Sequence, residues 1–231
     1  MPFVLSVNLG RPQPTAHSSE PVTAIDKRPV DGCVEVRAPG SRRDGLGSGL
    51  VGDAICDRRY HGGDDQAVYA YAREDLDMWA AALKRPLDNG CFGENLTTSE
   101  LDVTDARIGE RWRIGRALLL EVSLPRIPCR TFAGWLGERG WVKRFTRTGR
   151  PGAYLRVVEP GTVQRGDVID VIDRPAHDIT IGVVFRALTR EPLLLERVFA
   201  AGALPAAQQP DAQRKLEQAQ RTAVRGARAR G

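Results

Sequence analysis

The chain has 231 residues, of which 42% are hydrophobic and 27% are charged, a composition typical of a globular protein with one full core and at most a small satellite. Most of its formal net charge of +5 lies at the C-terminal end, because residues 211–231 hold six Lys or Arg against two Asp or Glu, a net of +4. No aromatic residue is interleaved with them, which argues against a nucleic-acid-binding arm and favours a solvated, frayed end carrying Arg225, Arg228 and Arg230.

The hydrophobic segments are short. The first, within Met1–Gly10, is too short for the core of a secretion signal and predicts a strand, and no stretch approaches the roughly 20 apolar residues of a membrane helix. The four cysteines, Cys33, Cys56, Cys91 and Cys129, show no CxxC spacing, which argues against a zinc site and a disulfide framework. We therefore expect a soluble, cytoplasmic protein with reduced thiols and no membrane partner.

Short β-branched segments dominate residues 1–172. Gly, Pro and Asp interrupt them at the spacing of an all-β sandwich or barrel. Gly109-Glu110 and Gly166-Asp167 each predict a tight turn into an alternating strand, as at the corners of small barrels. Two helices are expected between strands, Glu74–Leu83 and Phe132–Phe145, the second of them split by glycines. The predicted strands are Val4–Leu9, Val34–Arg37, Ala67–Tyr71, Ala117–Val122, Tyr154–Val158 and Val168–Ile172.

The pattern changes after Ile172. Asp173-Arg174-Pro175 breaks the last strand, and the residues that follow have a helical period. We predict three helices, one capped by Thr180, one over Glu191–Ala201 and one over Pro210–Gln220. Such a set buries little surface alone, so it is expected to pack on the barrel or on a partner. The predicted domains are therefore a β-barrel over residues 1–172 and a three-helix domain with a basic tail over residues 173–231.

Two glycine-containing segments are candidates for ligand binding. His61 is followed directly by Gly62 and Gly63, so backbone N–H groups could approach an anion closely. A hairpin turn with a surface histidine explains the same tripeptide. Glu94 and Asn95 could pair with the amide-like edges of a heterocycle, and an Asx-type turn entering a strand explains them as well. Neither segment alone decides between its two interpretations.

The segment Ser123–Thr131 carries the strongest chemical signal. It places Cys129 where a strand is expected to end and a helix to begin, with two prolines stiffening the approach. Arg126 and Arg130 bring positive charge, and the start of the helix adds its partial positive charge, so a thiolate is favoured. Such a thiolate is either a nucleophile or a ligand to a soft metal. The other three cysteines are interpreted as small buried hydrophobic residues.

Six stretches with motif-like sequences follow one another along the chain. They are Gly49–Asp53, His61–Gly63 with Ala67–Tyr69, Phe92–Thr97, Ile108–Glu110, Pro125–Cys129 and Gly149–Val157. Taken in this order, they resemble the MOSC domain of the molybdenum cofactor sulfurase C-terminal superfamily, and specifically its bacterial YiiM-like branch. The C-terminal helices are similar to the three-helix domain that commonly follows MOSC domains in this branch. Glu110 stands where the family usually has Asp, a change expected to affect a turn and not the site.

This resemblance implies a mainly β fold, a MOSC-type β-barrel with short helices and a small α-helical appendage. It implies a molybdenum cofactor, a molybdopterin, in a cleft at one side, with Cys129 as the protein ligand to molybdenum. It also implies the reduction of N-hydroxylated compounds, such as the base analogue 6-hydroxylaminopurine, to amines. Because the chain contains no flavin or haem motif, a separate reductase is expected to supply electrons. Self-association into a homodimer is left open.

The cofactor would require positive charge for its phosphate and hydrogen bonds for its rings. Arg126 is expected to bind phosphate or to stabilise oxide charge, whereas Arg150 and Lys27 are explained equally well as surface charges. The resemblance implies that His61 donates to the pterin or relays a proton, and that Tyr154 lies near the metal. The predicted site residues are Cys129, His61 and Arg126 for catalysis, and Gly62, Gly63, Asp53, Glu94, Asn95, Arg126, Arg130, Lys27, Arg150 and Tyr154 for the cofactor.

Two alternatives from other classes of protein stay open. Cys129 could be a nucleophile with His61 as its base, in a thiol enzyme or a persulfide-based sulfur carrier. The barrel could also lack a cofactor and act as an interaction module through its helices. Molybdenum content separates these hypotheses. Metal-free protein with a reactive Cys129 favours the first alternative. Protein that has neither molybdenum nor a reactive Cys129 favours the second.

Overall fold

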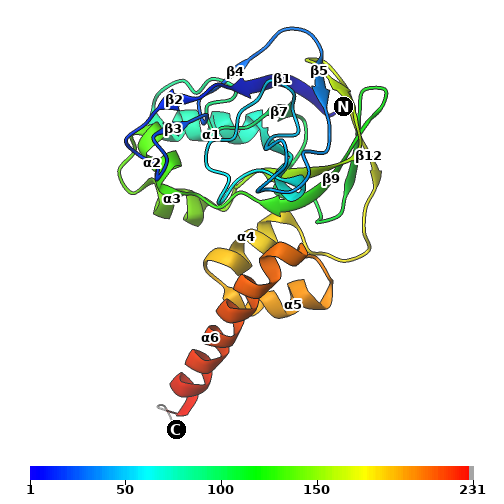
Figure 1. The fold of residues 1–231 in the computed structure, drawn as a ribbon. Coiled ribbons are helices and arrows are strands. Elements are labelled where there is room, and N and C mark those ends of the chain that lie inside the picture. Colours follow the sequence, from blue (N-terminus) through cyan, green and yellow to red (C-terminus); the bar gives the residue numbers. More distant parts are fainter. Residues whose placement is uncertain (229–231) are drawn as a thin grey trace.

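The computed structural model describes residues 1–228, with side chains through residue 225 (Figure 1). An eight-stranded sheet forms the main body, in the order β12-β8-β9-β10-β6-β7-β1-β4. Its strands are β1 (Phe3–Gly10), β4 (Lys27–Pro29), β6 (Val68–Ala72), β7 (Leu96–Ser99), β8 (Arg111–Ile114), β9 (Leu118–Pro125), β10 (Ala153–Glu159) and β12 (Ile169–Asp173). Two small sheets pair β2 (Gln13–Pro14) with β3 (Val22–Thr23) and β5 (Val34–Val36) with β11 (Gly161–Val163).

Six α-helices and three short 3-10 helices accompany the strands in the described part of the chain. The α-helices are α1 (Arg73–Leu83), α2 (Arg130–Leu136), α3 (Trp141–Thr148), α4 (Ile181–Thr189), α5 (Leu195–Ala200) and α6 (Gln209–Arg228). The 3-10 helices are η1 (Asp64–Gln66), η2 (Pro192–Leu194) and η3 (Ala206–Gln208). No helix in residues 1–228 is both long enough and apolar enough to cross a membrane.

The expectation of a mainly β barrel is not confirmed. The chain is about 30% helical and 26% strand, and no closed barrel is found over the described residues. The large sheet is mixed, because β6 and β7 pair in parallel while the other neighbouring strands are antiparallel. A parallel pair requires a crossover connection, and α1 lies within it. Helices α2 and α3 similarly connect β9 to β10 where a pure barrel would have a tight turn.

Glycines separate the two helices that connect β9 to β10, since Gly137 ends α2 and Gly140 precedes α3. Gly137 (φ 68°) and Gly140 (φ 71°) both adopt the left-handed conformation, which costs a glycine little. The N–H of Gly137 donates to the carbonyl of Ala133 at 3.1 Å, closing the end of α2. The predicted splitting of this helical segment is confirmed.

An aromatic cluster packs behind the strand–helix junction at the end of β9. The rings of Trp79 on α1 and Trp141 on α3 lie 4.6 Å apart between centroids. Phe92 packs 5.0 Å from Phe132 of α2 and 5.6 Å from Trp141, and all four side chains are buried. Such tilted and edge-on pairs contribute beyond their buried area. The cluster therefore fixes α2, and with it the residue that precedes it, relative to the sheet.

The C-terminal helices agree in number with the sequence prediction. Thr180 caps α4 by accepting from the N–H of Val183 at 3.3 Å, as expected. Helix α6 is longer than predicted and continues to Arg228. The expectation of a frayed end is therefore wrong for the residues up to Arg228. Arg230 lies outside the described residues. Figure 1 shows α6 extending away from the main body.

The apolar core continues across the predicted domain boundary at residue 173. Ile181 and Val184 of α4 belong to the same buried cluster as the sheet interior, and the ring of Phe185 lies 6.2 Å from that of Phe145. Each such side chain contributes about 1.5–3 kcal/mol by burial. We expect the fragment 1–172 to lose several kcal/mol of its free energy of unfolding, a large share of the typical total, and to melt well below the full chain by circular dichroism.

A fragment that ends at residue 220 is the matched control, because it removes the exposed end of α6 and retains the buried positions Ala212 and Leu216. It is expected to melt with the full chain. Equal melting temperatures for 1–172 and the full chain would contradict the expectation and establish the predicted boundary as that of an independent domain.

Candidate functional site

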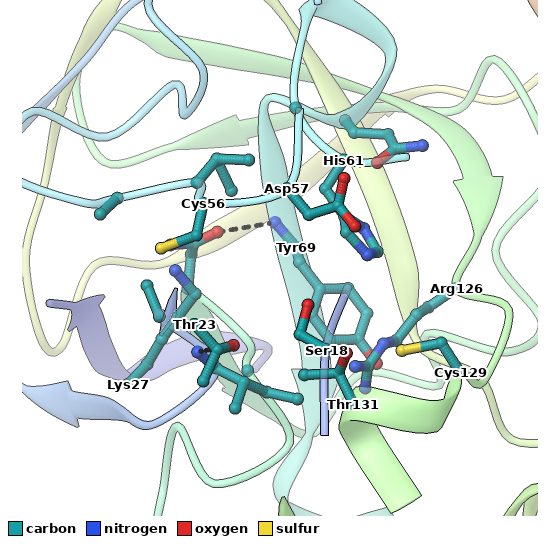
Figure 2. A pocket seen from close by; sticks show the side chains of 18 of the residues that line it. Ser18, Thr23, Lys27, Cys56, Asp57, His61, Tyr69, Arg126, Cys129 and Thr131 are labelled. Carbon is teal, nitrogen blue, oxygen red and sulfur yellow. Dashed lines mark hydrogen bonds between the residues drawn. The ribbon is translucent and has the colours of Figure 1, made fainter. Parts of the chain in front are cut away.

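Cys129 lines two chambers of one cavity, and Figure 2 shows its side chain among those that line one of them. We call the part lined by Lys27, Tyr69, Asn95 and Arg126 the inner chamber; its volume is about 100 Å³. The outer chamber has a volume of about 500 Å³ and opens beyond the thiol. A molecule in either chamber can therefore reach Cys129. The residues that line both chambers are Ser18, Asp57, His61, Gln66, Cys129, Thr131 and Tyr154.

The local chain path presents the thiol to this cavity. Strand β9 ends at Pro125, and Cys129 is extended (φ −127°, ψ 174°) directly before the first residue of α2. Its carbonyl accepts from the N–H of Ala133 at 3.1 Å, so its backbone is held by the first turn of the helix. The predicted position of Cys129 between a strand and a helix is confirmed.

The electrostatic environment favours the thiolate of Cys129. Burial raises the pKa of this thiol, but hydrogen bonding by His61, the positive charge of Arg126 and the backbone N–H of Phe132 together lower the pKa to about 6. Figure 2 shows the Cys129 sulfur beside the guanidinium of Arg126. At neutral pH the side chain is therefore mostly ionised, which makes it a soft ligand and a nucleophile.

Arg126 is a buried cation, not a surface charge. Its side chain is only 5% exposed, its Nη1 donates to the carbonyl of Phe92 at 2.8 Å, and its Cζ lies 3.8 Å from the centre of the Phe132 ring. No carboxylate among the described residues forms an ion pair with it. The thiolate of Cys129 and any anion in the cavity are thus its available counter-charges, and a buried cation requires one.

Two tyrosines complete the surroundings of this guanidinium. Tyr69 and Tyr154 both line the cavity, and the Cζ atom of Arg126 lies 5.4 Å from the centre of the Tyr69 ring. Burial raises the pKa of each hydroxyl, although the positive charge of Arg126 opposes this. The Tyr69 hydroxyl donates to the carbonyl of Pro151 at 2.8 Å. Both phenols therefore stay neutral near pH 7 and act as hydrogen-bonding groups. Tyr154 was predicted near the metal; Tyr69 lies in a predicted strand but was not singled out.

Asp53 binds two residues that line the inner chamber, Lys27 and Asn95, through its carboxylate. Its carboxylate forms a buried ion pair with Lys27 and accepts from the Asn95 amide at 2.9 Å, from Ser48 at 2.6 Å and from the backbone N–H of Gly10 at 2.7 Å. Lys27 is 5% exposed, so its interpretation as a surface charge is wrong. Asp53 is fully hydrogen-bonded and does not itself line either chamber, so its role is to position Lys27 and Asn95.

Besides Asp53, three predicted cofactor-binding residues lie outside both chambers. Glu94 accepts from the N–H groups of Gly90 at 2.6 Å and Phe92 at 3.0 Å, which braces the loop whose Phe92 carbonyl holds Arg126. Arg150 pairs with Asp75 at 3.0 Å. The Glu94 carboxylate and the Nη1 of Arg150 thus have partners within the fold, and a direct role of either residue in binding a cofactor stays a prediction.

Gly63 is the third of these residues, and it serves the turn. Its φ is 81°, and a Cβ there would come within 2.9 Å of the backbone of Arg42, so only glycine fits. Its N–H donates to the carbonyl of Gly47 at 3.0 Å. Gly62 lines the inner chamber, as predicted, and Arg130 lines only the outer chamber, where it is exposed.

The interpretation of the remaining cysteines as buried hydrophobic residues is wrong for two of them. Cys33 is exposed, and Cys56 lies in the wall of the inner chamber, where burial raises the pKa of its thiol. Cys91 is half-buried beside the aromatic cluster. The loop residue Ser18 and the turn residue Asp57 also line the cavity and were missed, because loops without a motif give no signal of where they pack.

The lowered pKa of Cys129 predicts its reactivity. In protein prepared without cofactor, we expect alkylation by iodoacetamide to rise with pH and to reach half its maximal rate near pH 6, because only the thiolate reacts. An ordinary thiol ionises near pH 8.5, and burial raises the pKa of Cys91. Site-resolved mass spectrometry should therefore find Cys129 modified first at pH 7. His61→Ala should move the midpoint to higher pH; an unchanged midpoint would remove His61 from the thiolate's environment.

The fold and the site together define a sheet-based protein with one thiolate-bearing, two-chambered cavity. Comparison identifies the class further: the MOSC domain matches residues 57–170, and the chain belongs to the MOSC domain family. It is 35% identical to the uncharacterized protein YflK of Bacillus subtilis over 77% of this chain and 76% of that protein. It is 31% identical to the protein YiiM of Escherichia coli over 58% of this chain and 60% of that one.

Solved structures agree with this assignment. The crystal structure of YiiM from Geobacillus stearothermophilus superposes with a TM-score of 0.73 at 26% identity, covering 94% of this chain and all of that one. The crystal structure of YiiM from Escherichia coli gives a TM-score of 0.68 at 22% identity, which supports the fold alone. A protein of Gibberella moniliformis named "Reductase" is 33% identical over 74% of this chain, which spans 29% of that longer protein.

Proposed function

We propose that this chain is a molybdenum-cofactor-dependent reductase that converts N-hydroxylated compounds, such as N-hydroxylated purine bases, to amines. The observation that carries the proposal is Cys129, a thiol with its pKa lowered to about 6 that lines both chambers. A soft thiolate is a suitable ligand for a thiophilic metal. Membership of the MOSC domain family supports the same cofactor.

The donor set around the cavity fits a molybdopterin. Arg126 is a buried cation without a carboxylate partner among the described residues, and Lys27 and Asn95 line the inner chamber with their polar ends held by Asp53. A phosphate group and a polar heterocycle are bound well by such cations and amides. Among the described residues no cluster of three or more His, Cys, Asp or Glu is placed to hold a metal ion. Cys129 is thus the residue that we assign to the metal.

The remaining residues would hold and orient the substrate and its protons. When bound, the cofactor would supply the two-electron chemistry of the reaction. The N-hydroxylated compound takes up two electrons and two protons, its N–O bond breaks, and the amine and one water leave. His61 lines both chambers, and we assign it to hold a proton near the leaving oxygen. Arg126 stabilises negative charge beside the thiolate.

A separate reductase is the proposed source of electrons. The reaction consumes two electrons per turnover, and the chain has no flavin or haem motif of its own. The Gibberella moniliformis protein named "Reductase" combines a region similar to this chain with a much longer remainder. A combination of this kind supports the supply of electrons by a reductase component. In the present case, a separate partner protein would supply the electrons to this chain.

The test is metal analysis and turnover of protein made in cells that synthesise molybdenum cofactor. We expect molybdenum near one atom per chain, and formation of adenine from 6-hydroxylaminopurine with a chemically reduced viologen as electron donor. A persulfide carrier is the second candidate, favoured by the same low pKa of Cys129. Metal-free protein that accepts sulfur at Cys129 would replace the proposal with that candidate.

A further inference from the structure

A basic surface surrounds helix α3. Lys143 and Arg147 are one turn apart on this helix and lie opposite Trp141 and Phe145, which are buried. Both cations are therefore directed to solvent, and both are exposed. Further exposed cations lie at the ends of α1 and α4 and in the turn between α2 and α3. We call the following six residues the basic face: Lys84, Arg85, Arg139, Lys143, Arg147 and Arg190.

Contacts between the helices make the basic face one continuous surface. The guanidinium of Arg144 in α3 donates to a carbonyl near the end of α1 at 2.9 Å. Arg85, just beyond α1, donates to the carbonyl of Leu136 at the end of α2 at 2.8 Å. The Nη1 of Arg190, which follows α4, lies 3.5 Å from the carbonyl oxygen of Arg147. Segments that are far apart in sequence thus bring their cations together around α3.

Most of these cations have no carboxylate partner. Glu138 pairs with Arg85 at 3.6 Å and Glu191 with Arg190 at 3.9 Å, whereas the other four form no ion pair within the described part of the chain. Residues 1–210 carry a net charge of only +1, so positive charge is concentrated here and balanced elsewhere. Two cations of α6 are instead paired within that helix, which extends away from the main body (Figure 1). The basic face is therefore suited to attract an acidic macromolecule.

The helices that carry the basic face also hold the site. Helix α2 begins directly after Cys129, and the Cζ of Arg126 lies 3.8 Å from the centre of the Phe132 ring of this helix. The Phe132 ring in turn lies 5.3 Å, between centroids, from the rings of Trp141 and Phe145 on the inner side of α3. Packed aromatic rings therefore connect α3 to the guanidinium beside the thiolate, and a partner bound at α3 would be close to the site.

We propose that the basic face is the docking surface for an acidic electron-transfer protein. The inference rests on the proposed function, because that reaction draws two electrons per turnover from a separate donor. The donor is oxidised by two electrons, the N–O bond of the substrate is reduced and broken, and two protons are taken up as the amine and water form. Opposite charges steer the donor to the basic face and fix its orientation. Its electrons then cross the packed aromatic rings behind α3.

The experiment uses a plant-type ferredoxin as the probe, a small acidic protein that carries one electron, so that two are consumed per turnover. Its binding to the full-length holoprotein is measured by calorimetry, and we expect added salt to weaken it. The double variant Lys143→Glu with Arg147→Glu should weaken binding by roughly tenfold or more. It should lower kcat/KM for ferredoxin-driven reduction by a similar factor. Turnover with a reduced viologen, a small donor that needs no docking surface, should stay at the wild-type value.

The double variant Arg221→Glu with Arg225→Glu is the matched control, because it changes the net charge equally at exposed positions of α6. It should bind ferredoxin as wild type does. Equal weakening by both double variants would overturn the proposal, since the attraction would then be to the overall charge. Absence of ferredoxin binding to wild type would overturn it too. Failure of the proposed function is distinct: ferredoxin binding at α3 without viologen-driven reduction supports the docking surface and refutes the reductase.

Discussion

Replacing Cys129 with Ser is expected to abolish both molybdenum binding and N-hydroxy reduction while leaving the fold intact. A hydroxyl has nearly the volume of a thiol, so the packing of the half-buried side chain before α2 is preserved. It is a harder donor and stays protonated at neutral pH, so it replaces a thiolate ligand poorly. Changes to residues that only orient a metal ligand already cost roughly 10- to 100-fold. The loss of the ligand itself should exceed that range.

The measurements for Cys129→Ser are metal content, turnover of 6-hydroxylaminopurine and thermal melting. Cys56→Ser is a matched control, since Cys56 also lines the inner chamber and its pKa is raised by burial. That variant should keep its molybdenum and most of its activity. Wild-type molybdenum content in Cys129→Ser would refute the assignment of Cys129 as the ligand. If Cys56→Ser lost its molybdenum and activity instead, the ligand would be reassigned to Cys56.

Arg126→Lys is expected to lower turnover by roughly tenfold or more, the scale for residues that orient a ligand, although the charge is conserved. The guanidinium donates to the Phe92 carbonyl while it stacks on Phe132 and faces the thiolate. A compact ammonium cannot do all three, because it lacks the planar fork and the stacking surface. A lysine keeps the charge, but without the bond to the Phe92 carbonyl and the stacking on Phe132 it is not held in the same place beside the sulfur, so the thiol pKa should rise from about 6 in the variant prepared without cofactor.

Arg130→Lys is the matched control for this prediction, because Arg130 is adjacent to Cys129 but exposed in the outer chamber. Lower molybdenum content in Arg126→Lys would place its role in binding the cofactor phosphate. Normal content with slower reduction would place it in stabilising charge during turnover. If both quantities and the alkylation midpoint match wild type, Arg126 has only a packing role.

Local sequence patterns were sufficient to predict that Cys129 lies between a strand and a helix with Arg126 close to it. Cys129 and Arg126 lie within one short segment, and the prolines around them restrict the backbone, so their proximity follows from the chain itself. The splitting of the helix that follows was predictable for the same reason, because glycines act at their own positions. The expected barrel was not recovered, since the parallel pairing of β6 with β7 depends on contacts between distant segments.

The roles of the more distant site residues could not be predicted. Glu94 and Asn95 are adjacent in sequence, yet only Asn95 lines the inner chamber while Glu94 braces the loop behind it. The partner of Arg150 is Asp75, which lies 75 residues earlier. Leu188 and Gln208, which line the outer chamber, had no motif. In each case the deciding information is which segments pack together, and that is a property of the tertiary structure.

The Asp53 carboxylate also determines when the inner chamber can form. It joins segments that are 43 residues apart at Gly10, 26 at Lys27 and 42 at Asn95. Contacts between segments this distant require long loops to close first. During synthesis, Lys27 and Asp53 leave the ribosome well before Asn95 does. The inner chamber is therefore complete only after these segments have come together, and under the proposed function the cofactor would enter a folded chain.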